Sequence, residues 1–290
     1  MNRARTLEEA RWQRVGAPLA ARAEPVAVED TTQYSLRKIV AIWAAAALPM
    51  ALLGWVVAPI VGDRLDLGVG DANREAFTRA GLLTLGLIWQ FILVMAIIWR
   101  EEGSLGWSKI RERCRLNAPQ DPRSGEKRGR LWLWLVPAIL LFGALQMAPI
   151  QDLWEKAFPF LGEPGRYSFD AIMNSADRKA ALEGAWQVFG LFLVLGVFNT
   201  VLGEELLFRG ILLPKMQGAF GKRDWLANGV LFGLYHLHQP WSIPGSIIDG
   251  TFCHALPARR FQSTWLAIVT HSTQTVFFSL LALGLVLGVA

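Results

Sequence analysis

The chain has 290 residues, of which 53% are hydrophobic and only 18% are charged, and its formal net charge is +5. Soluble domains carry about 25% charged residues, and the mean hydropathy of +0.32 is high for a soluble chain. This composition argues against a disordered or collagen-like chain, and two cysteines are too few for a disulfide framework. The basic residues do not form one stripe, so we expect no nucleic-acid partner. An all-α, multi-spanning membrane protein fits best.

Residues 1–38 form a polar tail of mixed charge, without the apolar core that a cleaved signal peptide needs. Apolar segments follow, and about 20 apolar residues suffice to cross a bilayer as a helix. We expect a transmembrane bundle of about seven helices, some short or broken, over residues 39–290, with a core at 186–285. The expected segments are 39–61, 80–99, 131–150, 186–202, 225–237, 243–256 and 265–289.

The positive charges alternate between the two sides of the predicted bundle. Seven Lys and Arg residues lie in the tail and nine in the loop 100–130, whereas the loop 151–185 has four with six acidic residues. Cytosolic loops of membrane proteins carry the excess of Lys and Arg. We therefore predict that the N-terminus, the loop 100–130 and the turn 215–223 face the cytosol, and that the protein is an integral, multi-pass protein of the cell membrane.

Two glutamates interrupt the fourth apolar segment, in the sequence GEELLFRG that begins at Gly203. If residues 186–214 form one helix, Glu204 and Glu205 fall in the inner half of the membrane, where an ionisable group usually marks function. Glu205 and Arg209 are one helical turn apart and can pair, while Glu204 points about 100° away. This predicts one structural and one available glutamate. The alternative is that both simply cap a helix end.

Histidines occur only at four positions, 236, 238, 254 and 271, all after the glutamates. Phe232 and His236 share one face of a short apolar segment, and His271 and Thr275 share one face of the last segment. A lone histidine on an apolar helix is most often structural, but buried polar groups need partners. We expect the glutamates, His236 and His271 to meet inside the bundle, and we interpret His238 as a loop residue.

The order EExxxR, FxxxH and a late histidine, each in an apolar segment, resembles the CPBP family of intramembrane proteases, which includes type II CAAX prenyl endopeptidases and bacteriocin-processing or ABI-like immunity relatives. The resemblance covers about residues 186–285. It implies that Glu204 and His236 activate a water molecule, and that Glu205, Arg209 and Phe232 orient the site. It implies that His271 stabilises the oxyanion, together with an Asn or Asp four residues later. This chain has Thr275 there.

The resemblance thus predicts hydrolysis of a peptide bond in a membrane-associated peptide or protein near the cytosolic face. No metal or other cofactor is favoured, because no HExxH spacing places two ligands one turn apart. If zinc takes part, Glu204, His236 and His271 are the expected ligands. A catalytically weak or inactive family member, acting as a membrane scaffold or an immunity or chaperone-like factor, is the alternative function, and Thr275 keeps it open.

A proton-relay transporter is a third possibility, but such proteins are commonly built from repeats, and the first three segments contain no counterpart of these motifs. The sequence does not identify the substrate, nor whether it is prenylated. The expected partners are therefore the lipid bilayer and a peptide or protein within it.

Overall fold

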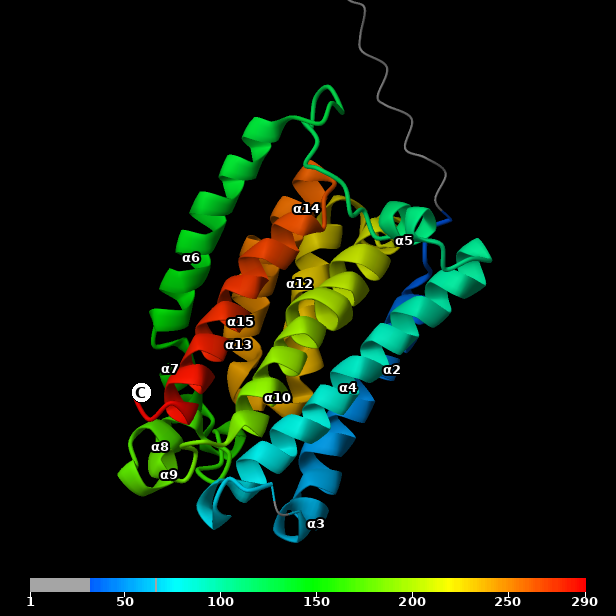
Figure 1. Ribbon diagram of the computed structural model, residues 1–290. Helices are drawn as coiled ribbons and strands as arrows, with labels where there is room; N and C mark the ends of the chain where they lie inside the picture. Colours follow the sequence, from blue (N-terminus) through cyan, green and yellow to red (C-terminus); the bar gives the residue numbers. More distant parts are fainter. Residues whose placement is uncertain (1–31, 66) are drawn as a thin grey trace, which may run out of the picture. The chain divides into compact units, whose positions relative to one another are not determined.

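The computed structural model describes residues 32–65 and 67–290, and over these residues the regular structure is entirely helical (Figure 1). Most of the predicted polar tail, residues 1–31, lies outside the described residues. Five helical segments are long and apolar enough to cross a membrane, which confirms a multi-pass membrane bundle. They are Leu36–Val61, Asp71–Glu102, Gly129–Ala157, Trp186–Lys215 and Trp265–Val286.

The named elements divide these segments further where the helix type changes. The first contains α2 (Leu36–Leu52) and α3 (Ala58–Val61), and the second is α4 (Asp71–Glu102). The third contains α6 (Leu135–Met147) and α7 (Ile150–Ala157), the fourth begins with α10 (Trp186–Val197), and the last is α15 (Trp265–Val286).

The two shorter apolar segments also form helices, as predicted. The fifth segment is α12 (Asp224–Tyr235), followed by one 3₁₀ turn, η9 (His236–His238). The sixth is broken into α13 (Ile243–Asp249), a π-helical stretch η11 (Gly250–Ala255) and α14 (Leu256–Phe261). Short helices α8 (Phe169–Met173) and α9 (Ala176–Ala180) lie in the loop before α10.

The fourth segment forms the centre of the bundle, between α4 and α15 (Figure 1). Leu206, Leu207, Phe208, Ile211 and Leu212 are all buried in the largest hydrophobic core, together with apolar side chains of α2, α4 and α12. Within a bilayer, close van der Waals packing of these side chains holds such a helix against its neighbours. The glutamates are therefore carried on the most enclosed helix.

This central helix is not a regular α-helix around the glutamates. Two π-helical stretches, η5 (Phe198–Gly203) and η6 (Leu206–Leu212), flank Glu204 and Glu205. In η5 the backbone N–H of Glu204 donates to the carbonyl of Asn199, five residues earlier. Such π turns occur frequently at functional sites. The wider turn changes which side chains share a face with Glu204.

Gly203 allows the π turn to pack closely. A Cβ at this position would overlap the carbonyl oxygen of Phe198 and lie 3.2 Å from that of Leu87 on α4. Both obstacles are backbone atoms, which cannot rotate away as a flexible side chain can. Gly203→Ala is therefore expected to lower the free energy of unfolding by about 1–3 kcal/mol and to displace Glu204. Chemical unfolding in detergent measures this effect. The control is Gly143→Ala, where a Cβ meets no atom within 4 Å; equal stability of the two variants would contradict the prediction.

The third apolar segment packs loosely on the rest of the bundle. Only 11% of its most apolar window is buried, against 33–44% in the other four segments. Phe142 is the one buried side chain of α6, and its ring lies 5.4 Å from that of His254 and 6.3 Å from that of His271. One phenyl ring thus covers this flank of the histidines.

One end of the bundle is basic and is tied together around Glu101. Lys215, at the end of the central segment, and Arg113 both pair with the Glu101 carboxylate, at 2.9 and 3.1 Å. The Tyr34 hydroxyl donates to the same carboxylate at 2.5 Å, and burial raises the pKa of this hydroxyl. Burial also raises the pKa of the neighbouring Cys114 thiol to about 12. Because four segments share this carboxylate, it anchors the basic end of the central segment.

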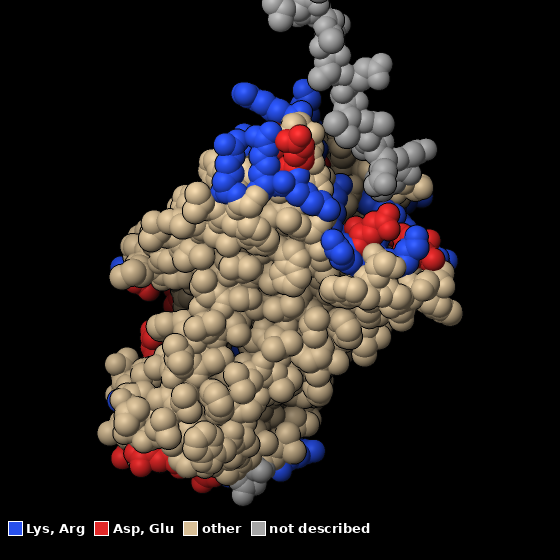
Figure 2. Space-filling view, turned by 45° about the horizontal axis from the view of Figure 1, so that its top comes forward, with Lys and Arg blue, Asp and Glu red and all other residues tan. Residues whose placement is uncertain are grey.

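Lys and Arg side chains gather at this end of the surface (Figure 2). The exposed ones include Arg37, Lys38, Arg100, Lys109, Arg111, Arg123, Lys127, Arg130, Lys222, Arg223 and Arg260.

Candidate active site

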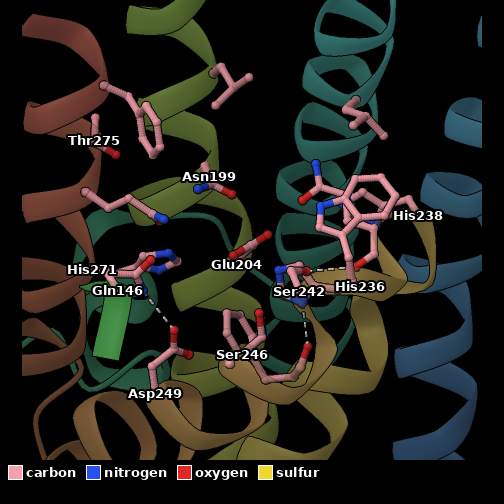
Figure 3. A pocket seen from close by; sticks show the side chains of 18 of the residues that line it. Gln146, Asn199, Glu204, His236, His238, Ser242, Ser246, Asp249, His271 and Thr275 are labelled. Atoms are coloured by element: carbon pink, nitrogen blue, oxygen red, sulfur yellow. Dashed lines mark hydrogen bonds between the residues drawn. The ribbon is translucent and has the colours of Figure 1, made fainter. Parts of the chain in front are cut away.

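Three predicted catalytic residues line one cavity of about 460 Å³ inside the bundle (Figure 3). Glu204 comes from the central helix, His236 from the turn after α12 and His271 from α15. Phe232 and Thr275 also line this cavity. The side chains that the sequence distributes over three apolar segments are thus brought together, as expected.

Glu204 is held by a buried network that includes a tyrosine. Only 3% of its surface is exposed, and Figure 3 shows its carboxylate between the side of the cavity with His271 and the side with His236. The Tyr235 hydroxyl accepts a hydrogen bond from the Gln90 amide at 2.5 Å and hydrogen-bonds the Glu204 carboxylate. A hydroxyl carries a single proton, so Tyr235 donates to Glu204. This donor fixes the direction of the carboxylate.

His236 has a defined tautomer. Its Nδ1 lies 3.0 Å from the carbonyl oxygen of Phe232, which can only accept. Nδ1 therefore carries the proton, and in the neutral ring Nε2 has a free lone pair. The rings of Phe232 and Tyr235 pack edge-on against the imidazole, each at 5.1 Å. Phe232 thus orients His236 both through its backbone and through its ring.

Glu205 forms the predicted ion pair with Arg209, with 3.0 Å between Oε1 and Nη1, and both side chains are fully buried. Arg209 also donates to the carbonyl of Gly250 at 2.9 Å, and its guanidinium lies 4.2 Å from the centre of the Phe232 ring. Oε1 of Glu205 accepts a second hydrogen bond, from Nδ1 of His271 at 2.9 Å. One carboxylate therefore joins the central helix to α15.

This bond leaves Nε2 as the free nitrogen of His271, whose ring lines the cavity. When both nitrogens carry protons, Nε2–H can donate into the cavity while Glu205 compensates the charge. His271 is therefore placed to bind a developing negative charge.

Thr275 lines the cavity but its hydroxyl is engaged elsewhere. The oxygen lies 3.0 Å from the hydroxyl of Thr200, which itself donates to the carbonyl of Gly196 at 3.0 Å. The Thr275 hydroxyl also donates to the carbonyl of Gly196 at 3.5 Å, so its one proton is engaged on the central segment. The sequence-based role of Thr275 in an oxyanion hole would require this bond to break.

Residues 185–277 match the family model described as type II CAAX prenyl endopeptidase, Rce1-like. This part of the chain, 93 of its 290 residues, is similar to that protease family. The matched range contains both glutamates, Arg209, the FxxxH motif, His271 and Thr275. No curated protein and no solved structure showed a match to the chain.

A bound metal ion would need several free ligand atoms that lie close together. Among the described residues, Glu205, His254 and His271 have ligand atoms within 4.8 Å of one another. The set expected from the sequence, Glu204, His236 and His271, does not form such a group. Oε1 of Glu205 already accepts from Arg209 and His271. A metal ion there would face the Arg209 guanidinium, which repels it. These residues do not fit a catalytic metal.

Four further residues of the site were not singled out from the sequence. Tyr235, Asn199 and Asp249 contact Glu204 or line the cavity, and His254 is buried with its ring stacked 4.8 Å from that of His271. Tyr235 precedes His236 in the FGLYH motif, and this position was the one sequence feature that could have indicated its place in the site. Asn199 lies five residues before Glu204, a spacing that an α-helix places on another face. His238, interpreted as a loop residue, is buried in the turn η9 and lines the cavity.

The cavity extends from Glu204 away from the basic end of the bundle. Its lining residues on the central segment, from Phe192 to Asn199, precede Glu204, and those on α15, from Gln274 to Phe278, follow His271. Gln151 of α7 and Phe169 of α8 complete it, and α7 and α8 lie at the opposite end of the bundle from α5 (Trp107–Arg113) and α14 (Figure 1). The lining residues therefore place the cavity between Glu204 and the end of the bundle that is opposite the basic end.

Proposed function

We propose that this protein is an intramembrane endopeptidase that hydrolyses a peptide bond with a water molecule held between Glu204 and His236. The observation that carries the proposal is the convergence of Glu204, His236 and His271 on one partly polar cavity. The family match supports the reaction class, because the Rce1-like family is a protease family.

The two acceptors would hold water in a reactive orientation. The Glu204 carboxylate and Nε2 of His236 can each accept one of the two protons of water. A lone pair of the water oxygen then remains free to attack the carbonyl carbon of the peptide. Glu204 takes a proton as the C–O bond forms and returns it to the nitrogen as the C–N bond breaks. The products are one carboxylic acid and one amine.

The direction of substrate access follows from the charge pattern. If the basic end faces the cytosol, as the excess of Lys and Arg in the loop 100–130 favours, the cavity extends toward the opposite side of the membrane. We therefore propose that a substrate segment reaches the site from within the bilayer or from the non-cytosolic side. Leader peptides and sorting segments of exported proteins suit this geometry as well as a prenylated tail does.

Peptide cleavage by purified protein in liposomes tests the proposal. The probes are a fluorescent peptide ending in S-farnesyl-cysteine and three further residues, its unmodified counterpart, and a library of apolar single-span peptides. We expect new termini, identified by mass spectrometry, that appear with the wild type and not with Glu204→Gln. Cleavage of none of the probes above the Glu204→Gln level would favour the scaffold or immunity function. Addition of each probe to one side of oriented liposomes then identifies the side of access.

A further inference from the structure

We propose that the side-chain amide of Asn199 donates the hydrogen bond to the oxyanion that the sequence pattern assigns to residue 275. This inference rests on the proposed protease function and names a further catalytic residue for it. Two observations carry it: the hydroxyl of Thr275 is already committed, and the amide of Asn199 lies uncommitted in the same cavity.

The hydroxyl of Thr275 has no proton to spare. Its oxygen lies 3.0 Å from the Thr200 hydroxyl, and it donates to the carbonyl of Gly196 at 3.5 Å. The methyl group of Thr275 packs against Gly196, where even a Cβ would overlap it. Rotation of Thr275 toward the cavity would break the hydrogen bond and disturb the contact between α10 and α15. Thr275 therefore serves to hold α15 against α10.

Asn199 is tied to Glu204 by the backbone. The N–H of Glu204 donates to the carbonyl of Asn199 in the π turn η5. On a regular α-helix, residues five apart point about 140° away from each other, whereas the π turn brings them toward one face. Figure 3 shows the Asn199 amide beside Glu204, on the side of the cavity where His271 and Thr275 lie. Asn199 is half-buried and lines the cavity.

The amide of Asn199 is free to bind a substrate atom. Among residues 32–65 and 67–290, no hydrogen bond of its side chain is found, and its NH₂ group has two donors. Of the other amides that line the cavity, Gln146 donates to Asp249 at 3.3 Å. Gln274 also lines the cavity, but its longer side chain has one more rotatable bond to order, and its backbone is not bonded to that of Glu204. Asn199 is therefore the better-placed donor.

The proposed role transfers no proton. When the water oxygen bonds to the carbonyl carbon, the π electron pair moves onto the carbonyl oxygen. The NH₂ of Asn199 and Nε2–H of His271 donate to this oxygen, and both hydrogen bonds weaken again when the C–N bond breaks and the carbonyl re-forms. Pre-positioned donors of this kind act mainly on the transition state.

The kinetics of the Asn199→Leu variant test the inference. Leucine has about the same size as asparagine but has no hydrogen-bond donor in its side chain. We expect kcat to fall by about 10²–10³-fold with KM changed less than threefold and an unchanged unfolding temperature. A phosphonamidate peptide, which mimics the tetrahedral intermediate, should lose affinity in proportion to kcat/KM. Asn174→Leu, at an exposed asparagine, is the matched control. Thr275→Val and Gln274→Ala should each cost less than Asn199→Leu.

The alternatives give different results. Activity of Asn199→Leu within threefold of the wild type, with a larger loss in Thr275→Val or Gln274→Ala, would overturn the role of Asn199 and leave the protease function intact. A loss of folded protein with unchanged kcat per folded molecule would assign Asn199 a structural role only. A wild type no more active than Glu204→Gln would reject the proposed function itself, and the role of Asn199 with it.

Discussion

Glu204→Gln is expected to reduce peptide cleavage by at least about 10²–10⁴-fold, the usual contribution of a positioned general base. Glutamine keeps the shape of the side chain and can still accept the hydrogen bond from Tyr235, but its amide cannot take a proton from water. Because Glu204 is buried without an ion-pair partner of its own among the described residues, neutralising it should not destabilise the bundle. We therefore expect an unchanged or higher unfolding temperature in detergent.

The control for this prediction is Glu126→Gln, the same change at an exposed carboxylate in the loop 100–130. It should leave both cleavage and unfolding unchanged. If Glu204→Gln retains more than a tenth of the wild-type rate on a probe that the wild type cleaves, Glu204 is not the base.

Arg209→Met is expected to lower the free energy of unfolding by about 3–5 kcal/mol, because it leaves the buried Glu205 carboxylate without its main partner. The variant also loses the hydrogen bond from Arg209 to the carbonyl of Gly250 and the contact with the Phe232 ring. Chemical unfolding in detergent, followed by tryptophan fluorescence, measures the change. Arg223→Met, at an exposed arginine, should shift the unfolding midpoint little.

A double-mutant cycle separates the ion pair from the rest of the loss. In Glu205→Gln/Arg209→Met the uncompensated charge is gone, so the double variant should be less destabilised than the sum of the two single variants, by about 0.5–3 kcal/mol. Strict additivity would show that the pair contributes nothing. Where Arg209→Met does not fold, Arg209→Lys keeps the charge but loses the fork of donors, and it should show the same order of effects on a smaller scale.

Much of the bundle could be predicted from the chain because the interactions concerned are local. A run of about 20 apolar residues favours a membrane span wherever it occurs, and the structure has five such spans. The pairing of Glu205 with Arg209 follows from the helical repeat alone. The short, proline-punctuated segments were expected to be irregular, and the sixth indeed contains the π-helical stretch Gly250–Ala255 between two short helices.

Several parts of the candidate site could not be predicted in this way. His254 contacts His271 only because Gly250 and its neighbours bring the sixth segment against the central helix. Glu205 serves Arg209 and His271 together, which removes it from the set of free ligands. Both facts depend on distances between segments far apart in the chain, and no short sequence pattern encodes them.

The sequence by itself determined which chemical groups lie inside the membrane: two carboxylates, one arginine and the histidines, on helices specified by hydrophobic length. The tertiary structure decided which of these groups have free protons or lone pairs. The physical reason is that helical propensity and hydrophobicity act over one turn, whereas the π turn Asn199–Glu204 also depends on Gly203, where the backbone of α4 packs closely. A separate contact, that of α15 with Gly196 and Thr200, engages the hydroxyl of Thr275, and the amide of Asn199 remains in the cavity.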